Sequence, residues 1–423
     1  MSKLKELIEE LCPNGVEYKP LWKVTIWDKK FNGVDKSKQI KVISYKYYLS
    51  SDFAKVERKN GNIKYICTGI SGEERYTTEE LAGDYLSEGE VVCIPWGGKP
   101  NVKYYNGKFV TGDNRIATSL DTRVLNNKFL YYWMQSKINI ISKFYRGSGI
   151  KHPSMKDILD IQIPVPPLEV QCEIVRILDR FTELEVEFEA KLEAELEARR
   201  KQYEYYRDKI LNFDDTGNPC NCTHTHTHTH THGYFYKQKI KWKKLEEICD
   251  LSAGGDINKE DVKKEKTKEY SIPVLSNGIG DNALYGYTNI VRIAAPCITI
   301  SARGTIGYCE LRKENFYPIV RLICVKPKTD EINIEFLKYY IQTIKFKTPT
   351  SGISQLTVPM TKSYQIPIPT IEEQEKIANV LDRFEKLCND ISEGLSAEIE
   401  IRKKQYEYYR DKLLTFKELK VEN

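Results

Sequence analysis

Apolar residues recur at steps of three and four in two segments of the chain, 163–213 and 366–416. This spacing places them on one face of a helix. Each segment opens with an Ile-Pro-x-Pro lead, and Thr370 and Glu373 have the spacing of a capping box. We therefore expect long helices over 168–213 and 371–416. Their narrow apolar stripe favours a two-helix coiled coil over two ordinary core helices. Six residues form the predicted helix-pairing seam: Leu178, Phe181, Leu184, Leu381, Phe384 and Leu387.

The two helical segments are copies of one another. They lie 203 residues apart, align without a gap and match at 27 of 51 positions. Both end in the run Lys-Gln-Tyr-Glu-Tyr-Tyr-Arg-Asp-Lys, at 201–209 and 404–412. The stretches before each copy hardly resemble one another, so the chain is organised as variable domain, fixed helix, variable domain, fixed helix.

The variable domains are predicted to be rich in β-strands. Short β-branched and aromatic runs, separated by Gly, Asn and Asp, are typical of strands and turns. The expected strands include 39–45, 62–67 and 90–95 in the first domain, and 270–275, 297–301 and 320–325 in the second. Faint landmarks also repeat, because Gly98 corresponds to Gly304 and Arg115 to Arg321 at an offset of 206. This pattern indicates a common scaffold with diverged contact surfaces.

The predicted fold is therefore α+β, an internal repeat of two β-rich domains and two long helices. The expected boundaries are 1–167 for the first domain, 168–213 for its helix, 214–241 for a linker, 242–370 for the second domain, 371–416 for its helix and 417–423 for a tail.

Charge is segregated along the chain. The net charge is +5, yet residues 17–162 carry 24 basic against 16 acidic residues, whereas residues 163–213 carry 8 against 12. Clustered basic residues are typical of a phosphate-binding surface. The eleven scattered cysteines favour a reducing compartment over a disulfide framework. No stretch of 18 apolar residues or signal peptide is evident, so we expect a cytoplasmic protein without a membrane partner.

Glycine-bearing loops with Arg, Lys, Asn or Gln are the candidate contacts of this phosphate-binding surface with its ligand, because such side chains bind phosphates and base edges. The alternative is that these glycines only serve hairpin turns. Loops of the first domain supply Gly98, Lys99, Asn101, Asn114, Arg115, Arg146 and Lys151, and loops of the second supply Asn277, Ser301, Arg303, Thr305 and Gln355.

Five Thr-His pairs stand in a row at 223–232. With Cys220 and Cys222 they resemble a metal-binding tract, but alternating histidines in a polar linker lack a preorganised cage. We therefore predict no metal site. The tract is better explained in the gene, since Thr and His codons allow an uninterrupted CA repeat.

The Leu-Asp-Arg-Phe motifs at 178–181 and 381–384, the repeated helix endings and the opening Leu11-Cys-Pro-Asn-Gly-Val-Glu-Tyr18 resemble the specificity subunit of type I restriction-modification systems. The resemblance covers essentially the whole chain. It implies that each variable domain is a target-recognition domain for one half of a bipartite site in double-stranded DNA. It further implies that the helices pair antiparallel and fix the spacing.

The same resemblance implies a non-catalytic subunit that docks two methyltransferase subunits, which use S-adenosylmethionine, and two restriction/translocase subunits, which use ATP and Mg²⁺. It gives the subunit itself no cofactor and no catalytic residue. Consistently, the sequence has no Asn/Asp-Pro-Pro-Tyr/Phe tetrapeptide and no phosphate-binding Gly-x-x-x-x-Gly-Lys-Ser/Thr loop. Two alternatives remain open: a coiled-coil adaptor that does not read DNA, and a DNA-modifying enzyme with its own recognition domain.

Overall fold

The computed structural model describes residues 2–69, 74–213, 240–349 and 354–419. The Thr-His tract, Cys220 and Cys222 lie outside the described residues. The chain forms two compact units: residues 1–191 with 396–423, and residues 192–395. Each unit contains one β-rich domain and one half of each long helix.

The first domain is built on a six-stranded sheet with the order β2-β7-β5-β6-β3-β4. Its elements are α1 (Ser2–Leu11), β1 (Tyr18–Pro20), α2 (Leu21–Val24), β2 (Thr25–Trp27), a 3-10 turn (Lys36–Lys38), α3 (Ser50–Val56), β3 (Ile63–Ile66), β4 (Tyr76–Thr77), α4 (Glu79–Ala82), a 3-10 turn (Gly83–Tyr85), β5 (Ser87–Pro95), β6 (Lys103–Thr111), β7 (Asn114–Ser119), α5 (Asn127–Ser136), α6 (Ile138–Lys143), β8 (Tyr145–Arg146), β9 (His152–Pro153), α7 (Met155–Leu159), β10 (Gln162–Pro164) and α8 (Leu168–Ile210).

The second domain has a four-stranded sheet, β12-β18-β15-β16, and a three-stranded sheet, β14-β13-β17. Its elements are β11 (Lys241–Lys244), α9 (Leu245–Ile248), β12 (Cys249–Ala253), a 3-10 turn (Lys259–Asp261), β13 (Ile272–Leu275), a 3-10 turn (Gly280–Ala283), β14 (Leu284–Thr288), β15 (Cys297–Ser301), β16 (Cys309–Arg312), β17 (Tyr317–Pro318), β18 (Leu322–Pro327), α10 (Ile334–Thr343), α11 (Val358–Lys362), β19 (Gln365–Ile368) and α12 (Ile371–Leu413).

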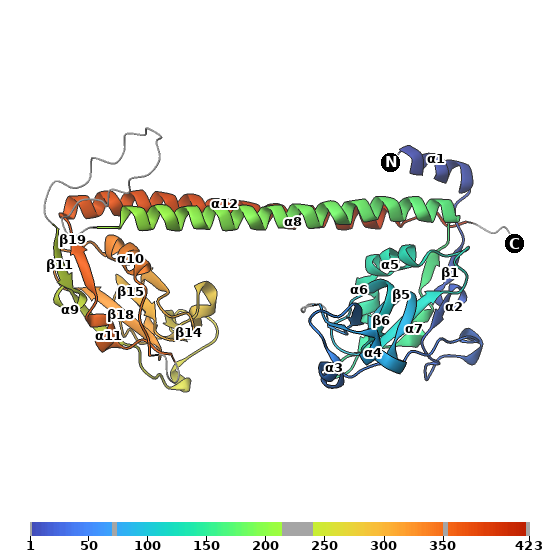
Figure 1. Ribbon diagram of the computed structural model, residues 1–423, viewed down its shortest axis with the longest axis horizontal. Helices are drawn as coiled ribbons and strands as arrows, with labels where there is room; N and C mark the ends of the chain where they lie inside the picture. The colour runs from blue at the N-terminus through green and yellow to red at the C-terminus, as the bar shows by residue number, and fades with distance from the viewer. Residues whose placement is uncertain (1, 70–73, 214–239, 350–353, 420–423) are drawn as a thin grey trace. The chain divides into compact units, whose positions relative to one another are not determined.

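Both domains share one scaffold. The order β2-β7-β5-β6 of the first matches β12-β18-β15-β16 of the second, element for element in chain order. A helix follows the last of these strands in each domain, α5 in the first and α10 in the second, and packs on the long helix of its own unit (Figure 1). The structure therefore confirms two β-rich domains in an internal repeat.

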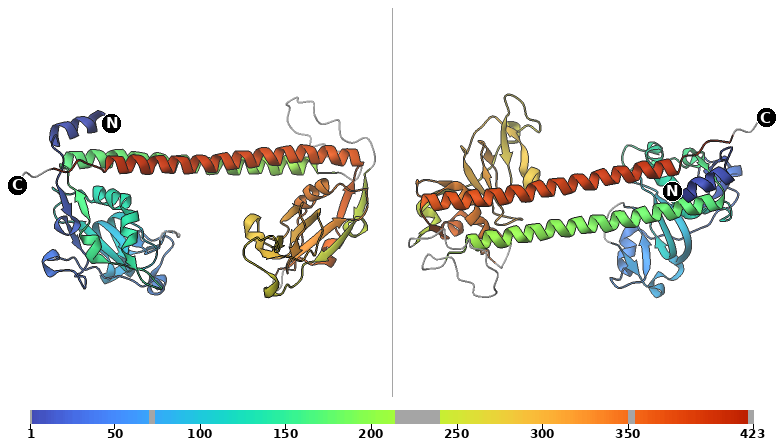
Figure 2. Two further views of the ribbon diagram at one scale, coloured as in Figure 1. Left: turned by 180° about the vertical axis from the view of Figure 1, so that it is seen from behind. Right: turned by 90° about the horizontal axis from the view of Figure 1, so that it is seen from above.

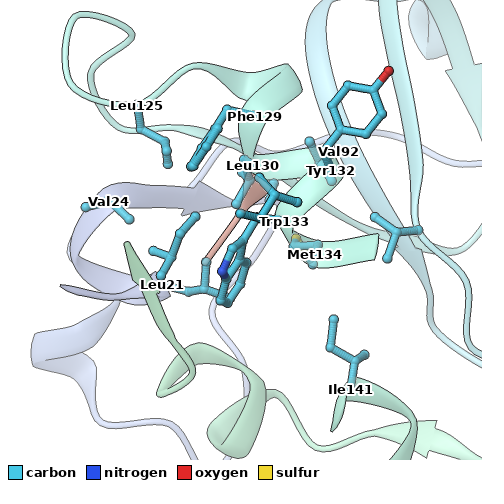
Figure 3. Packing of buried hydrophobic residues seen from close by; sticks show 14 of the residues in the cluster. Leu21, Val24, Val92, Leu125, Phe129, Leu130, Tyr132, Trp133, Met134 and Ile141 are labelled. Atoms are coloured by element: carbon cyan, nitrogen blue, oxygen red, sulfur yellow. The ribbon is translucent and has the colours of Figure 1, made fainter. Parts of the chain in front are cut away.

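The core of the first unit joins the sheet, α5 and the long helices. Side chains of α2 (Leu21, Val24) and α5 (Leu130, Trp133) gather with Val92 of β5 (Figure 3). This cluster also includes Leu178 of α8 and Leu414, just beyond α12. In the second unit, Phe336 of α10 packs in a cluster with Leu381 of α12 and with Leu211 and Phe213, just beyond α8. Each core therefore holds the start of one long helix and the residues that end the other.

Within each unit the halves of α8 and α12 run side by side and antiparallel (Figure 2). In the first unit, Thr182 lies 3.4 Å from the Tyr406 hydroxyl, and Arg402 lies 4.5 Å from the Phe188 ring centre. In the second unit, the rings of Tyr206 and Phe384 stack at 6.2 Å. The capping box at the start of α12 is confirmed, because the Thr370 amide donates to Glu373 and the Glu373 amide donates to the Thr370 hydroxyl.

The strand predicted at 39–45 was wrong. This segment makes only an isolated bridge between Val42 and Trp27, and Ile40 is exposed. The Gln39 side chain accepts from the Phe31 amide at 2.8 Å and donates to the Lys29 carbonyl at 2.9 Å. These bonds hold the backbone in a loop, and β-branched residues alone could not reveal them.

Candidate nucleic-acid interface

One loop in the second domain gathers most of its candidate residues. β15 ends at Ser301, and the loop that follows is tied to Asn277. The side-chain amide of Asn277 donates to the Arg303 backbone carbonyl at 2.6 Å. The hydroxyls of Ser301 and Thr305 both donate to the Asn277 carbonyl, at 3.2 and 3.1 Å. Gly304 has a φ of +76°, which favours glycine. Ser301 is buried and supports the loop, whereas Thr305 is exposed and Arg303 is partly exposed.

Gln355 lies beside the same loop. The Leu356 amide donates to the Ala302 carbonyl at 2.8 Å, and the Gln355 side chain is exposed. The Ala302 amide in turn donates to the Arg321 carbonyl at 2.9 Å. The structure thus brings all five candidates of the second domain together and adds Arg321 to them.

The corresponding loop of the first domain follows β5, the counterpart of β15. The Gly98 amide donates to the Lys151 carbonyl at 3.0 Å, and His152 Nδ1 bonds the Trp96 carbonyl at 2.7 Å. Asn101 donates to the carbonyls of Thr68 and Lys99, both at 3.2 Å. Lys99 and Lys151 are exposed. Gly98, Lys99, Asn101 and Lys151 therefore form one loop cluster.

Arg115 and Asn114 are buried beside this cluster. Arg115 is 3% exposed, lies 4.0 Å from the Trp96 ring centre and forms ion pairs with Asp28 and Asp113 at 3.5 and 3.1 Å. Burial raises the pKa of Asp28, although the Arg115 charge opposes this. Asn114 is also buried and donates to the Ile66 carbonyl at 2.7 Å. In this structure both side chains bond other groups of the first domain and are shielded from solvent.

Arg146 lies at the edge of the same region. It pairs with His152 across the β8–β9 ladder, and its exposed guanidinium lies 3.0 Å from the Asp157 carboxylate. An exposed ion pair of this kind contributes little to stability.

The six seam residues divide into buried and exposed groups. Leu178 and Leu381 are fully buried in the cores of their own units, and Phe181 is half-buried. Leu184, Phe384 and Leu387 are 44%, 39% and 58% exposed. Their role as a pairing seam stays a prediction. The half-buried positions after Phe181 include Glu185 and Phe188. The stripe between the helices therefore contains a carboxylate, which a search for apolar residues alone does not find.

Two repeated contacts that the sequence did not predict attach each domain to its helix. The Gln171 side chain accepts from the Asn126 amide at 2.8 Å and donates to the carbonyls of Val124 and Pro166. Gln374 makes the same bonds to Asn333, Glu331 and Pro369. Both glutamines are fully buried. The two glutamines match at the 203 offset in the sequence, but the domain residues that they bond, Asn126 and Val124 in one unit and Asn333 and Glu331 in the other, lie outside the repeat.

The tyrosines of α5 and α10 supply the second repeated contact. The Tyr132 hydroxyl donates to Asp179 at 2.6 Å, and the Tyr339 hydroxyl donates to Asp382 at 2.5 Å. Burial and the neighbouring carboxylates raise the pKa of both tyrosines. The phenols therefore remain protonated donors that lock each domain to its long helix.

Several chemistries find no support in the part of the chain that the structure describes. Within those ranges, no three His, Cys, Asp or Glu residues are grouped so as to hold a metal ion. Eight of the cysteines there are free thiols: Cys12, Cys67, Cys93, Cys172, Cys249, Cys297, Cys309 and Cys324. None of the described helices is both long and apolar enough to cross a membrane.

The fold is an internal repeat of two β-rich domains, each attached to one of two long helices that run antiparallel within each unit. Comparison with known proteins agrees. The family described as the type I restriction modification DNA specificity domain matches residues 40–198 and 238–401. A putative type I specificity subunit of Mycoplasma pneumoniae is 35% identical over 81% of this chain and 96% of its own length.

A putative type I restriction enzyme specificity subunit of Haemophilus influenzae is 31% identical over 85% of this chain and 89% of its own length. A solved structure concerned with complex assembly and conformational transition of the type I R-M system shares the fold, with a TM-score of 0.58, 16% identity, and coverage of 83% of this chain and 91% of that one. The chain therefore belongs to the family of type I restriction-modification specificity subunits.

Proposed function

We propose that each domain reads one half of a bipartite site in double-stranded DNA. The observation that carries this proposal is the pair of matching loop clusters. In each domain the loop after the same central strand, β5 or β15, collects exposed polar and basic side chains. Matching scaffolds with different loop residues suit two half-sites of different sequence. Lys99, Lys151, Arg303, Thr305 and Gln355 are the proposed contacts.

We infer that the long helices hold the two domains at a fixed separation. The support is the repeated attachment through Gln171 and Gln374 and through the Tyr132–Asp179 and Tyr339–Asp382 bonds. A buried amide that makes three hydrogen bonds tolerates little rotation, because each lost bond leaves a polar group unsatisfied. The spacer between the half-sites should therefore be constant.

The helices also carry a repeated apolar surface that suits two identical partners. In the first unit Leu184, Tyr408 and Tyr409 are exposed, and in the second their repeat equivalents Leu387, Tyr205 and Tyr206 are exposed. Aromatic and aliphatic residues of this kind form the anchors of protein interfaces. We propose that each set docks one methyltransferase subunit, which uses S-adenosylmethionine to methylate adenine. Two restriction/translocase subunits, which use ATP and Mg²⁺, would complete the assembly in the cytoplasm.

Selection of randomised duplex DNA by the chain, in complex with its methyltransferase subunits, tests the proposal. We expect one bipartite motif of constant spacer length, with an affinity that falls as salt rises. Recovery of no motif and no salt-dependent shift would favour an adaptor without DNA readout. Methylation by the chain alone, without methyltransferase subunits, would favour the DNA-modifying enzyme.

A further inference from the structure

Arg321 has an unusual backbone conformation. It is the single non-glycine residue with a positive φ, +78°, among the residues that the structure describes. A side chain in this left-handed region is disfavoured, and glycine would occupy it without strain. Strained residues cluster at functional sites, where the surrounding structure holds them in place. The strain alone identifies the position as unusual, and its surroundings indicate what it does.

The turn that holds Arg321 is fixed on several sides. The Ala302 amide donates to the Arg321 carbonyl at 2.9 Å, which joins the turn to the loop of Arg303. The Ile319 amide donates to the Leu275 carbonyl at 2.9 Å, and the Gly254 amide donates to the Leu322 carbonyl at 2.8 Å. A Cβ at Gly254 would lie 2.2 Å from the Ile319 carbonyl oxygen, so the close approach requires glycine. The backbone of Arg321 is therefore held against the candidate DNA-binding loop.

The Arg321 side chain, in contrast, has no bonding partner among the described residues. Arg321 is exposed, and within the described ranges no hydrogen bond or ion pair reaches its guanidinium. Its landmark counterpart Arg115 is 3% exposed and paired with Asp28 and Asp113. The shared scaffold thus neutralises the arginine in one domain and presents it to solvent in the other. A free guanidinium on a rigid backbone loses little entropy when it binds a planar acceptor pair.

We propose that Arg321 is a specificity-determining residue of the second domain and reads a guanine through paired hydrogen bonds to O6 and N7. This is the commonest specific contact of arginine in the major groove. The inference deepens the proposed function and rests on it. Arg115, by contrast, acts as a positioning residue beneath Trp96.

The test compares Arg321→Gly with the wild-type chain, each in complex with the methyltransferase subunits. Glycine adopts the positive φ freely, so the variant should unfold at the same temperature as wild type or a higher one. Selection of randomised duplexes should then show one G·C pair relaxed, with about tenfold less discrimination at that pair. The relaxed pair should lie in the half-site that is retained when residues 17–162 are exchanged. Lys313→Ala removes another exposed positive charge of the same domain and should leave the motif unchanged.

Two results would overturn the inference. One is an unchanged motif with unchanged discrimination. The other is a uniform loss of affinity for all sequences with a salt dependence weaker by about one ion, which indicates a phosphate contact. If Arg321→Gly does not fold, Arg321→Asn replaces it, since asparagine tolerates left-handed backbone. A wild-type complex that selects no bipartite motif would instead overturn the proposed function, so the two failures are distinguishable.

Discussion

The Tyr132 hydroxyl donates a hydrogen bond to Asp179 over 2.6 Å, and this bond joins α5 of the first domain to its long helix. Lys128 pairs with the same carboxylate at 2.8 Å. The second unit repeats the attachment with Tyr339 and Asp382. Under the proposed function, a recognition domain that turned on its helix would lose its register on DNA.

Tyr132→Phe should therefore destabilise the first unit. Hydrogen bonds to charged groups contribute about 1.5–3 kcal/mol, so the free energy of unfolding should fall by roughly that amount. Thermal or urea unfolding measures it. Tyr205→Phe is the matched control, because the Tyr205 side chain is 61% exposed. Equal losses in the two variants would show that the Tyr132–Asp179 bond does not hold the domain.

Substitutions at Leu381 and Leu387 distinguish core packing from the proposed docking of a partner. Leu381 is fully buried, so Leu381→Glu places a charge in the core of the second unit and should cost several kcal/mol of stability, about 3 or more. Leu387 is 58% exposed, so Leu387→Glu should change stability by less than about 0.5 kcal/mol. It should nevertheless weaken copurification with the methyltransferase. A large loss of stability in Leu387→Glu would indicate that Leu387 packs in the pairing seam and does not dock the methyltransferase.

The sequence predicted the elements of this fold better than their contacts. Periodicity and repetition identified the long helices, and the turn residues identified most core strands, because these are local signals. Loop residues such as Arg303 and Gln355 converge through backbone hydrogen bonds between distant segments, which no local pattern encodes. Arg115 and Arg321 illustrate the limit: they share a landmark position, yet only the three-dimensional packing shows that one is buried and the other exposed.

Exchange of residues 17–162 for the corresponding domain of a relative should alter one half of the recognised motif. The other half and the spacer length should persist, since α8 with Gln171 is unchanged and Gln171 bonds backbone groups of the domain, the Asn126 amide and the Val124 carbonyl, rather than side chains. Sequencing of methylated adenines in cells that carry the hybrid gives the readout. A hybrid in which both halves change, or neither does, would contradict independent reading by the two domains.

Glu185 should make the stability of the first unit depend on pH. Burial between the helices raises the pKa of Glu185, and the nearby carboxylate of Glu189 raises it further. The charge of Lys403 opposes this; Glu407 raises the pKa slightly and Arg410 lowers it slightly. A carboxyl group with a raised folded-state pKa contributes stability below its unfolded pKa of about 4, and this contribution is lost as the pH rises through the folded-state value.

Glu185→Gln should therefore raise the melting temperature at pH 7 and leave it unchanged near pH 4. Glu187→Gln is the matched control with the opposite sign, because the Lys191 ammonium lowers the pKa of Glu187. Its bond stabilises the fold above the unfolded pKa and is lost as the pH falls, so this variant should be slightly less stable at pH 7. If the melting temperatures of the two variants changed with pH in the same way, Glu185 would not have a pKa raised by burial.

A fragment of residues 1–213 should form a homodimer. Leu211 and Phe213 end the first repeat and pack in the core of the second unit, and Leu414 and Phe416 end the second repeat and pack in the core of the first. The residues at the two ends are the same, at the 203 offset. A second copy of the fragment could therefore place its own Leu211 and Phe213 where Leu414 and Phe416 lie, as a two-fold contact requires.

Light scattering should give twice the fragment mass, and Phe213→Ala should shift the fragment toward monomer by removing a buried aromatic side chain worth about 3–5 kcal/mol. With the methyltransferase, the dimer should recognise a palindrome built from the first half-site. Such a fragment would arise in cells if the codons at 223–232 form a CA repeat that slips out of frame. A monomeric fragment would contradict the interchange of the two ends, and a tract of mixed codons or constant length would exclude the genetic switch while leaving the dimer untouched.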